Sequence, residues 1–148
     1  MQIFGQKIGF GLVVGSFLML SVGAHAQEPA ADEAAAASGK RYIFSVKIME
    51  TIARSVAGIA GPSGENRKAM LTETNRLLHE AYPELIIPPG KGEWIFNSVG
   101  GSLAEIKILF CSPSEYVALW GSPIETDGFS GRYHYMDVWD IMLDGRMT

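Results

Sequence analysis

The strongest constraint on the fold is a change of residue pattern at Pro88, Pro89 and Gly90. Before this point, apolar residues recur every three or four positions, as on one face of an amphipathic helix. After it, short runs rich in β-branched and aromatic residues alternate with turn residues, which is typical of antiparallel strands. Because a helical part precedes a sequential set of strands, the sequence predicts the α+β class.

Two helices are expected before the change of pattern. The first occupies residues 41–60 and ends at a Gly-Pro pair. The second has Ser63 as its N-cap, with Glu65 in the first turn, and stops before Pro83. Its polar side carries both acidic and basic side chains rather than a lysine-rich band, which argues against a helix that binds a membrane surface electrostatically.

Four strands are expected after the change of pattern, and they predict a sequential antiparallel sheet. In one of them, Glu105-Ile106-Lys107-Ile108 alternates polar with apolar residues, as a half-buried strand does. Such a sheet has an open edge, which proteins normally close or cover. The chain is therefore expected to be a short relative of a longer protein, or to have a partner that covers the edge. The predicted strands are residues 93–98, 104–111, 115–120 and 132–139.

Residues 1–26 have the pattern of a targeting segment. One basic residue precedes the largely apolar residues 8–24, and Ala24 and Ala26 provide the small side chains of a cleavage site. The apolar run is slightly shorter than the ~20 residues that span a bilayer. A cleaved signal peptide and a retained membrane anchor both fit, and both predict the secretory pathway, with a periplasmic or membrane-associated location in a bacterium.

The remaining chain divides into a linker and one domain. Residues 27–40 are rich in alanine and acidic residues and contain almost no bulky apolar side chain, so they predict a flexible linker. Residues 41–148 are long enough to form one folded domain. The net charge of −4 makes nucleic-acid binding improbable.

Several kinds of site are excluded by residue counts and missing motifs. The single cysteine, Cys111, excludes an intrachain disulfide and a cysteine-rich zinc site, and is expected to be a small buried side chain. The histidines are scattered, and no phosphate-binding loop, dinucleotide fingerprint or hydrolase motif is present. The sequence therefore predicts no metal and no cofactor.

An acidic cluster is the strongest candidate for chemistry. Asp137, Asp140 and Asp144 lie among aromatic and other apolar residues. Asp137 and Asp140 are separated by an odd number of positions, so in a regular strand their side chains face opposite sides. Either both lie in water at a strand end, or one points into an apolar interior, where desolvation raises its pKa.

Three segments together resemble the family of fungal C-8 sterol isomerases and sigma non-opioid receptors. They are Trp94-Ile95-Phe96 followed by Gly100-Gly101, residues 112–121 (SPSEYVALWG) and residues 128–133 (GFSGRY). The resemblance covers about residues 42–145. It implies a cupin-like β-barrel around a closed apolar pocket, with helices and an N-terminal membrane segment before it. In a eukaryotic relative it implies the endoplasmic reticulum membrane.

The resemblance also assigns site residues. It makes Tyr116 and Tyr133 the aromatic wall of the pocket and Asp140 its buried acid. Asp137 is the alternative acid, because the spacing to the following glycine differs by one residue. Glu115 is expected to be a structural hydrogen-bonding carboxylate. The family's second acid and its later strands fall beyond Thr148. The apolar lining is expected to be Ile106, Ile108 and Ala118.

Two functions follow from this resemblance. The first is binding of a sterol-like or amine-bearing hydrophobic ligand, with C-8 sterol isomerase activity as its catalytic form, in which a carboxylic acid protonates an alkene carbon and a base removes a neighbouring proton. The second is a non-catalytic interaction module whose open sheet pairs with another chain. The glycine pair near Ala104 implies a subunit contact and therefore a homo-oligomer.

Overall fold

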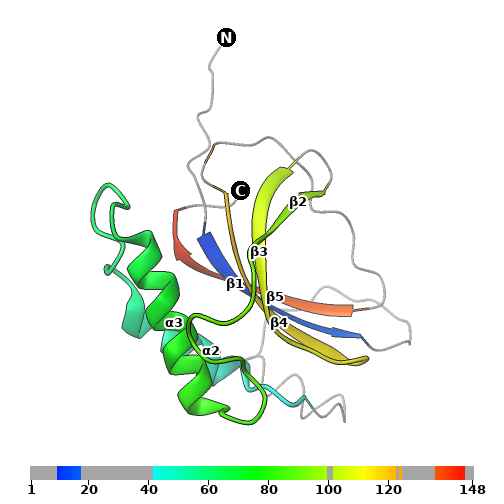
Figure 1. Ribbon diagram of the computed structural model, residues 1–148. Helices are drawn as coiled ribbons and strands as arrows, with labels where there is room; N and C mark the ends of the chain where they lie inside the picture. Colours follow the sequence, from blue (N-terminus) through cyan, green and yellow to red (C-terminus); the bar gives the residue numbers. More distant parts are fainter. Residues whose placement is uncertain (1–9, 18–41, 100–101, 123, 125–135, 146–148) are drawn as a thin grey trace, which may run out of the picture.

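The computed structural model describes residues 10–17, 42–99, 102–122, 124 and 136–145 of the 148-residue chain (Figure 1). These residues form two helices, α2 (Val46–Val56) and α3 (Arg67–Ala81), and one antiparallel sheet, which confirms the α+β class. Among the described residues, neither helix is long and apolar enough to cross a bilayer. The strands are β1 (Phe10–Phe17), β2 (Ile95–Val99), β3 (Ser102–Cys111), β4 (Glu115–Gly121) and β5 (Met136–Asp144).

Both helices lie where the apolar pattern predicts them, with shorter bounds. α2 begins at an N-cap, Ser45, whose side chain accepts a hydrogen bond from the backbone N–H of Ile48. The N-cap prediction at Ser63 is wrong, because α3 begins after Asn66. Two glycines before Asn66 have φ of +77° and +70°, so the turn continues past Ser63 before the helix begins. α3 ends at Ala81, before Pro83, as predicted.

The sheet has the strand order β2-β3-β4-β1-β5. The first three strands are sequential, as predicted, but β1 lies between β4 and β5 and pairs with both in antiparallel register. The prediction of a fully sequential sheet is therefore wrong. β1 belongs to the segment expected to be a signal peptide or anchor, and both of these roles remain predictions. Among the described strands, β2 and β5 are the open edges of the sheet.

The hydrophobic core lies between the helices and one face of the sheet (Figure 1). Because side chains alternate along a strand, alternate residues of β3, β4 and β5 point towards the helices. The sheet supplies Leu109, Val117, Leu119 and Leu143 to this core, and the helices supply Met49, Ile52, Val56, Met70, Leu71 and Leu78.

A bulge in β3 changes which residues reach the core. The register with β4 shifts between Ile108 and Phe110. As a result Leu109 and Phe110 both contact the core, and Cys111 pairs with Tyr116. Cys111 is exposed, so its predicted burial is wrong. Regular alternation would have placed Cys111 on the same face as Leu109.

In β3 the helices cover the polar side of the alternating pattern, and the isoleucines lie on the other face of the sheet. Lys107 is only 8% exposed because it points towards the helices, whereas Ile108 is 42% exposed on the other face. The pattern predicts a strand correctly, but it does not identify which face the helices cover.

Candidate functional site

The predicted site residues gather on the face of the sheet that points away from the helices, which we call the distal face. It carries Ile106 and Ile108 of β3, Tyr116, Ala118 and Trp120 of β4, and Asp140 of β5. Their sequence neighbours, such as Leu109, Val117 and Ile141, pack into the core, so the alternate residues point to the opposite side.

The strand register aligns these residues across the sheet. Ile108 pairs with Ala118, Ala118 pairs with the β1 position Val13, and Val13 pairs with Asp140. Ile106 pairs with Trp120 in the neighbouring row. The structure therefore brings five of the predicted site residues to one face: Ile106, Ile108, Tyr116, Ala118 and Asp140. Tyr133 lies outside the described residues.

Asp140 is the acidic side chain that the described strands place on this face. Its side chain is exposed, so the described residues do not form the closed pocket that the resemblance implies. Nevertheless, surrounding protein atoms desolvate the carboxyl group and raise its pKa above the usual value. The carboxyl group thus has one side in solvent and its other sides against protein atoms. Desolvation therefore favours the protonated form of this carboxyl more than in an ordinary aspartate.

Asp137 lies on the opposite, helix-covered face and has a structural contact there. Its Oδ2 accepts a hydrogen bond of 2.7 Å from the Tyr42 hydroxyl. The Tyr42 ring packs edge-on against Trp139, with 5.2 Å between the ring centroids. Burial, together with this hydrogen bond and the nearby carboxylate, raises the pKa of Tyr42 above its usual range. Asp137 therefore attaches the segment before α2 to β5 and does not share a face with Asp140.

Glu115 is a buried structural carboxylate, as predicted. Its Oε1 accepts a hydrogen bond of 2.6 Å from the backbone N–H of Ile43, and its Oε2 accepts one of 3.3 Å from the N–H of Phe44. The side chain is 4% exposed. It connects the start of β4 to the segment that leads into α2.

Trp120 is a distal-face residue that the sequence-based site assignment omitted. The Trp120 Nε1–H is buried and has no hydrogen-bond partner among the described residues. A buried donor without an acceptor is unfavourable, so this N–H is available to an oxygen atom of a bound molecule. The signal was present in the sequence, because Trp120 continues the alternation of Tyr116 and Ala118.

Comparisons with known proteins give a consistent result. A family profile described as "ERG2 and Sigma1 receptor like protein" matches residues 18–148. The sigma non-opioid intracellular receptor 1 of Taricha granulosa is 31% identical over 108 residues, which are 73% of this chain and 45% of the receptor. The receptor of Danio rerio is 28% identical over 108 residues, which are 73% of this chain and 46% of the receptor.

An enzyme is among the similar proteins as well. The C-8 sterol isomerase ERG2 of Gibberella zeae is 30% identical over 101 residues, which are 68% of this chain and 41% of the enzyme. The chain therefore spans less than half the length of these curated relatives. No solved structure matches the chain.

Proposed function

Because the chain belongs to the ERG2 and Sigma1 receptor like family, we propose that its distal face binds a sterol-like or amine-bearing hydrophobic ligand. The family contains proteins named as receptors and proteins named as sterol isomerases. The observation that carries the proposal is the position of Asp140, a carboxyl on the same face as the apolar and aromatic side chains of Ile108, Ala118 and Tyr116. Ligand sites commonly combine such a surface with a few polar groups.

Each distal-face residue has a role in this proposal. The Asp140 carboxylate pairs with the ligand's ammonium group, and Tyr116 offers an aromatic ring to the cation or to the hydrophobic body. Trp120 Nε1–H donates to a ligand oxygen such as a sterol hydroxyl. Ile106, Ile108 and Ala118 contact the apolar part of the ligand.

The catalytic form of the proposal uses the protonated state of the same carboxyl. Asp140 donates its proton to one alkene carbon of a C-8 unsaturated sterol, which produces a tertiary carbocation. A base then removes a proton from a neighbouring carbon, and the double bond is shifted without a net change in atoms. The raised pKa of Asp140 favours the acid form that the first step needs. We assign this role to Asp140 rather than Asp137, which faces the helices.

The substitution Asp140→Asn tests the proposal in the full chain. We expect it to weaken binding of a cationic amphiphile about tenfold, because it removes the carboxylate that pairs with the ammonium group. If the wild type converts a C-8 unsaturated sterol, Asp140→Asn is expected to abolish the conversion. The measurements are calorimetric titration and chromatography of the sterol products.

Asp137→Asn is the matched control, because it removes the same charge from the other face of β5 while its amide oxygen still accepts from Tyr42. It is expected to leave amphiphile affinity within about twofold of the wild type. Equal affinity in the wild type and in Asp140→Asn would contradict the proposal.

The raised pKa of Asp140 also predicts a pH dependence of binding. With a quaternary ammonium amphiphile the ligand charge is constant, so only the protein titrates. Affinity is expected to be full where Asp140 is ionised, and to fall as pH is lowered through a midpoint above the ordinary aspartate value of about 3.9. Asp140→Asn should remove this transition from the titration curves. A wild-type midpoint at or below the ordinary value would contradict the assignment.

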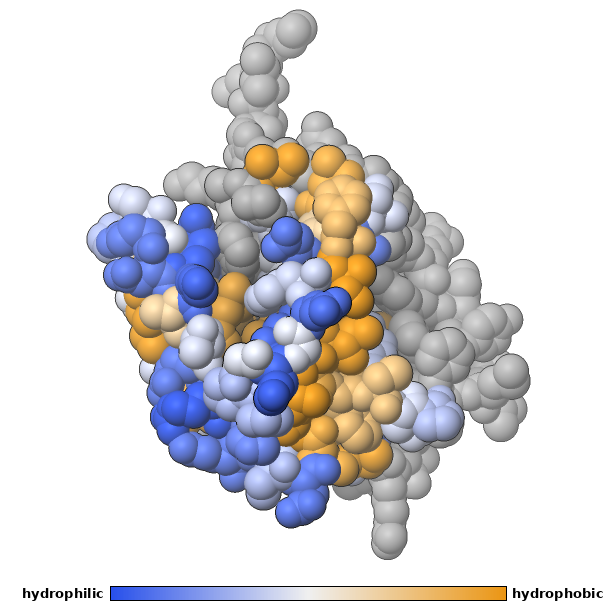
Figure 2. All heavy atoms as spheres, in the orientation of Figure 1, coloured by the Kyte–Doolittle hydropathy of each residue, from blue (hydrophilic) through white to orange (hydrophobic). Residues whose placement is uncertain are grey.

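A second function, self-association, has its own supporting observation. Figure 2 shows a band of hydrophobic residues over the sheet, and β2 and β3 carry exposed large hydrophobic side chains, of which Phe96 is 68% exposed. Among the described strands, β2 also lies at an edge of the sheet, and an edge strand favours pairing with another chain. Sedimentation velocity of the full chain distinguishes this interaction module from a monomeric binding protein. Membrane association and a secretory-pathway location belong to the same proposal as the ligand.

A further inference from the structure

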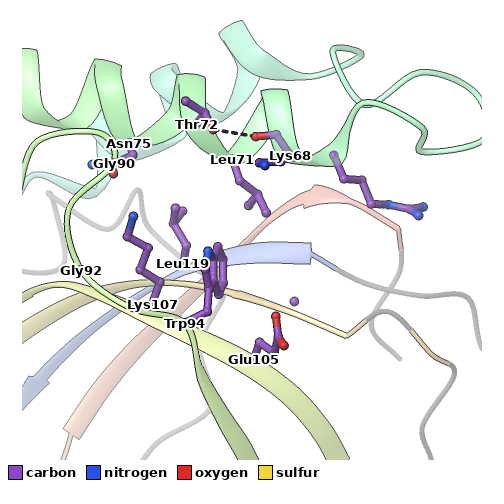
Figure 3. Close-up of a pocket in the computed structure, with 12 residues that line it drawn as sticks. Lys68, Leu71, Thr72, Asn75, Gly90, Gly92, Trp94, Glu105, Lys107 and Leu119 are labelled. Atoms are coloured by element: carbon purple, nitrogen blue, oxygen red, sulfur yellow. Dashed lines mark hydrogen bonds between the residues drawn. The ribbon is translucent and has the colours of Figure 1, made fainter.

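A cavity of about 550 Å³ lies between α3 and the sheet, on the side opposite the distal face (Figure 3). Its volume is within the range of small-molecule sites. The proposed function does not use any of its residues. The described residues that line it include Arg67, Lys68, Leu71, Asn75, Trp94 and Lys107.

Lys107 is the most unusual residue of this cavity. Its side chain points from β3 towards α3, as Figure 3 shows, and is 8% exposed. It forms no hydrogen bond or ion pair with any described residue, and burial lowers the pKa of its amine. The amine nitrogen keeps contact with solvent through the cavity while the rest of the side chain is buried, so an anion that enters the cavity can pair with a partly desolvated ammonium.

A glycine allows the loop before β2 to close over this lysine. Gly92 has φ of +77°, and a Cβ atom there would lie 2.6 Å from Ile87 Cδ1 and 3.4 Å from Lys107 Cε. A larger residue at position 92 would therefore meet the end of the Ile87 side chain and adopt a strained backbone conformation. The glycine also lets the loop lie within van der Waals distance of the Lys107 stem.

The side-chain oxygen of Asn75 is a second polar group of the cavity. Asn75 is 2% exposed, and its Nδ2 donates a hydrogen bond of 2.8 Å to the Ile87 carbonyl oxygen. This bond fixes the orientation of the amide, and Oδ1 is then left buried without a donor among the described residues. Within the described part of the chain, the cavity thus has one cation without an ion-pair partner and one buried acceptor without a donor.

The charges around the cavity favour an anionic ligand. Arg67, Lys68 and Lys107 are cationic, and Glu105 is the acidic residue among the described lining. Arg67 already pairs with Asp144, with 2.6 Å between Nε and Oδ2. Trp94, Leu71 and Leu119 provide the apolar part of the lining.

We propose that this cavity is a second ligand site, which binds a small amphiphile that carries a carboxylate and an adjacent hydroxyl. The carboxylate pairs with Lys107, and the hydroxyl donates to Asn75 Oδ1. The apolar tail lies against Trp94 and Leu71. This site selects the opposite ligand charge from the distal face, so the two sites are chemically distinct.

The test uses 2-hydroxyoctanoate as the probe, with octanoate and octylamine as chain-length controls. In calorimetric titration of the full chain, 2-hydroxyoctanoate is expected to bind most tightly, octanoate less tightly and octylamine most weakly. Lys107→Met retains the apolar stem and removes the charge, and is expected to weaken both carboxylates at least tenfold. Its thermal midpoint without ligand should not fall, because the substitution removes a partly desolvated charge and keeps the packed apolar stem. The control Lys47→Met removes an exposed lysine of α2 and should bind as the wild type does.

Amide and indole proton shifts locate the binding. The carboxylates should shift the Trp94 indole N–H and the Gly92 amide and leave the Trp120 indole unchanged. The proposal is overturned if the wild type binds neither carboxylate, because water then satisfies both groups. It is also overturned if Lys107→Met retains wild-type affinity or if the shifts map to Trp120. None of these results depends on whether the distal face binds its cationic ligand.

Discussion

Replacement of Glu115 by alanine is expected to lower the free energy of unfolding by about 3 kcal/mol. Its carboxylate accepts the backbone N–H groups of Ile43 and Phe44, and the N–H of Phe44 is buried. Hydrogen bonds to a charged group contribute about 1.5–3 kcal/mol each, and a buried N–H left without an acceptor adds its own desolvation cost. The hydrogen bond from Ile43 is expected to contribute the lower value of that range, because the Ile43 side chain is exposed. Denaturant unfolding monitored by fluorescence measures the change.

Two companion variants show whether the effect arises from these bonds. Glu115→Gln retains one carbonyl oxygen as an acceptor, so its loss should be intermediate. Glu93→Ala removes an exposed glutamate near the start of β2 and should change stability by less than about 0.5 kcal/mol. If Glu115→Ala unfolds at the wild-type denaturant concentration, the carboxylate has no structural role.

Deletion of residues 1–26 is expected to abolish cooperative unfolding of the domain. β1 is paired along its length with β4 on one side and with β5 on the other. Without β1, both neighbouring strands expose unpaired backbone N–H and C=O groups, and β5 loses its described strand partner. Thermal unfolding monitored by near-UV circular dichroism measures the result, which should be a broad change without a sharp midpoint.

Deletion of residues 1–9 is the matched control, because it shortens the same end of the chain and leaves β1 intact. It should unfold with the wild-type midpoint. If the protein without residues 1–26 still unfolds sharply at the wild-type temperature, the segment is better explained as a removable signal peptide or anchor. The family match begins at residue 18, after β1. Loss of the sharp transition would show that β1 is part of the domain although the family match does not include it. Retention of the transition would show that the domain folds without it.

Local sequence patterns predict most of the fold because they report periodicity and chain breaks. The apolar spacing before Pro83 locates both helices, and the β-rich runs after Gly90 locate β2, β3 and β4. The N-cap of α3 was missed because two left-handed glycines extend the preceding turn beyond Ser63. A capping side chain identifies a helix start only if the backbone after it is already helical.

The faces of the sheet were harder to predict than its strands. Alternation separates Lys107 from Ile108, but only tertiary packing determines which of them the helices cover. The bulge near Leu109 is likewise invisible in the residue pattern, and it moves Cys111 to the exposed face. β1 could not be identified as a strand, because its apolar residues also fit a targeting segment.

The residues that the resemblance assigns to a pocket include several that alternate along β3 and β4, and their role in binding stays a prediction. Ile106 and Ile108 share a face, as do Tyr116 and Ala118, and these two pairs meet across β3 and β4. The closed pocket was not predictable in this way, because closure requires segments from other parts of a chain to cover that face.

The three-residue step from Asp137 to Asp140 limits the chemistry available to β5. Since the sheet itself stands between the two carboxyl groups, a proton cannot pass directly from one to the other. A catalyst that needs a donor and an acceptor on the same side of a substrate must therefore recruit the second group from a different strand or from a second polypeptide. An isolated Asp140 is better suited to electrostatic recognition than to a complete donor–acceptor cycle.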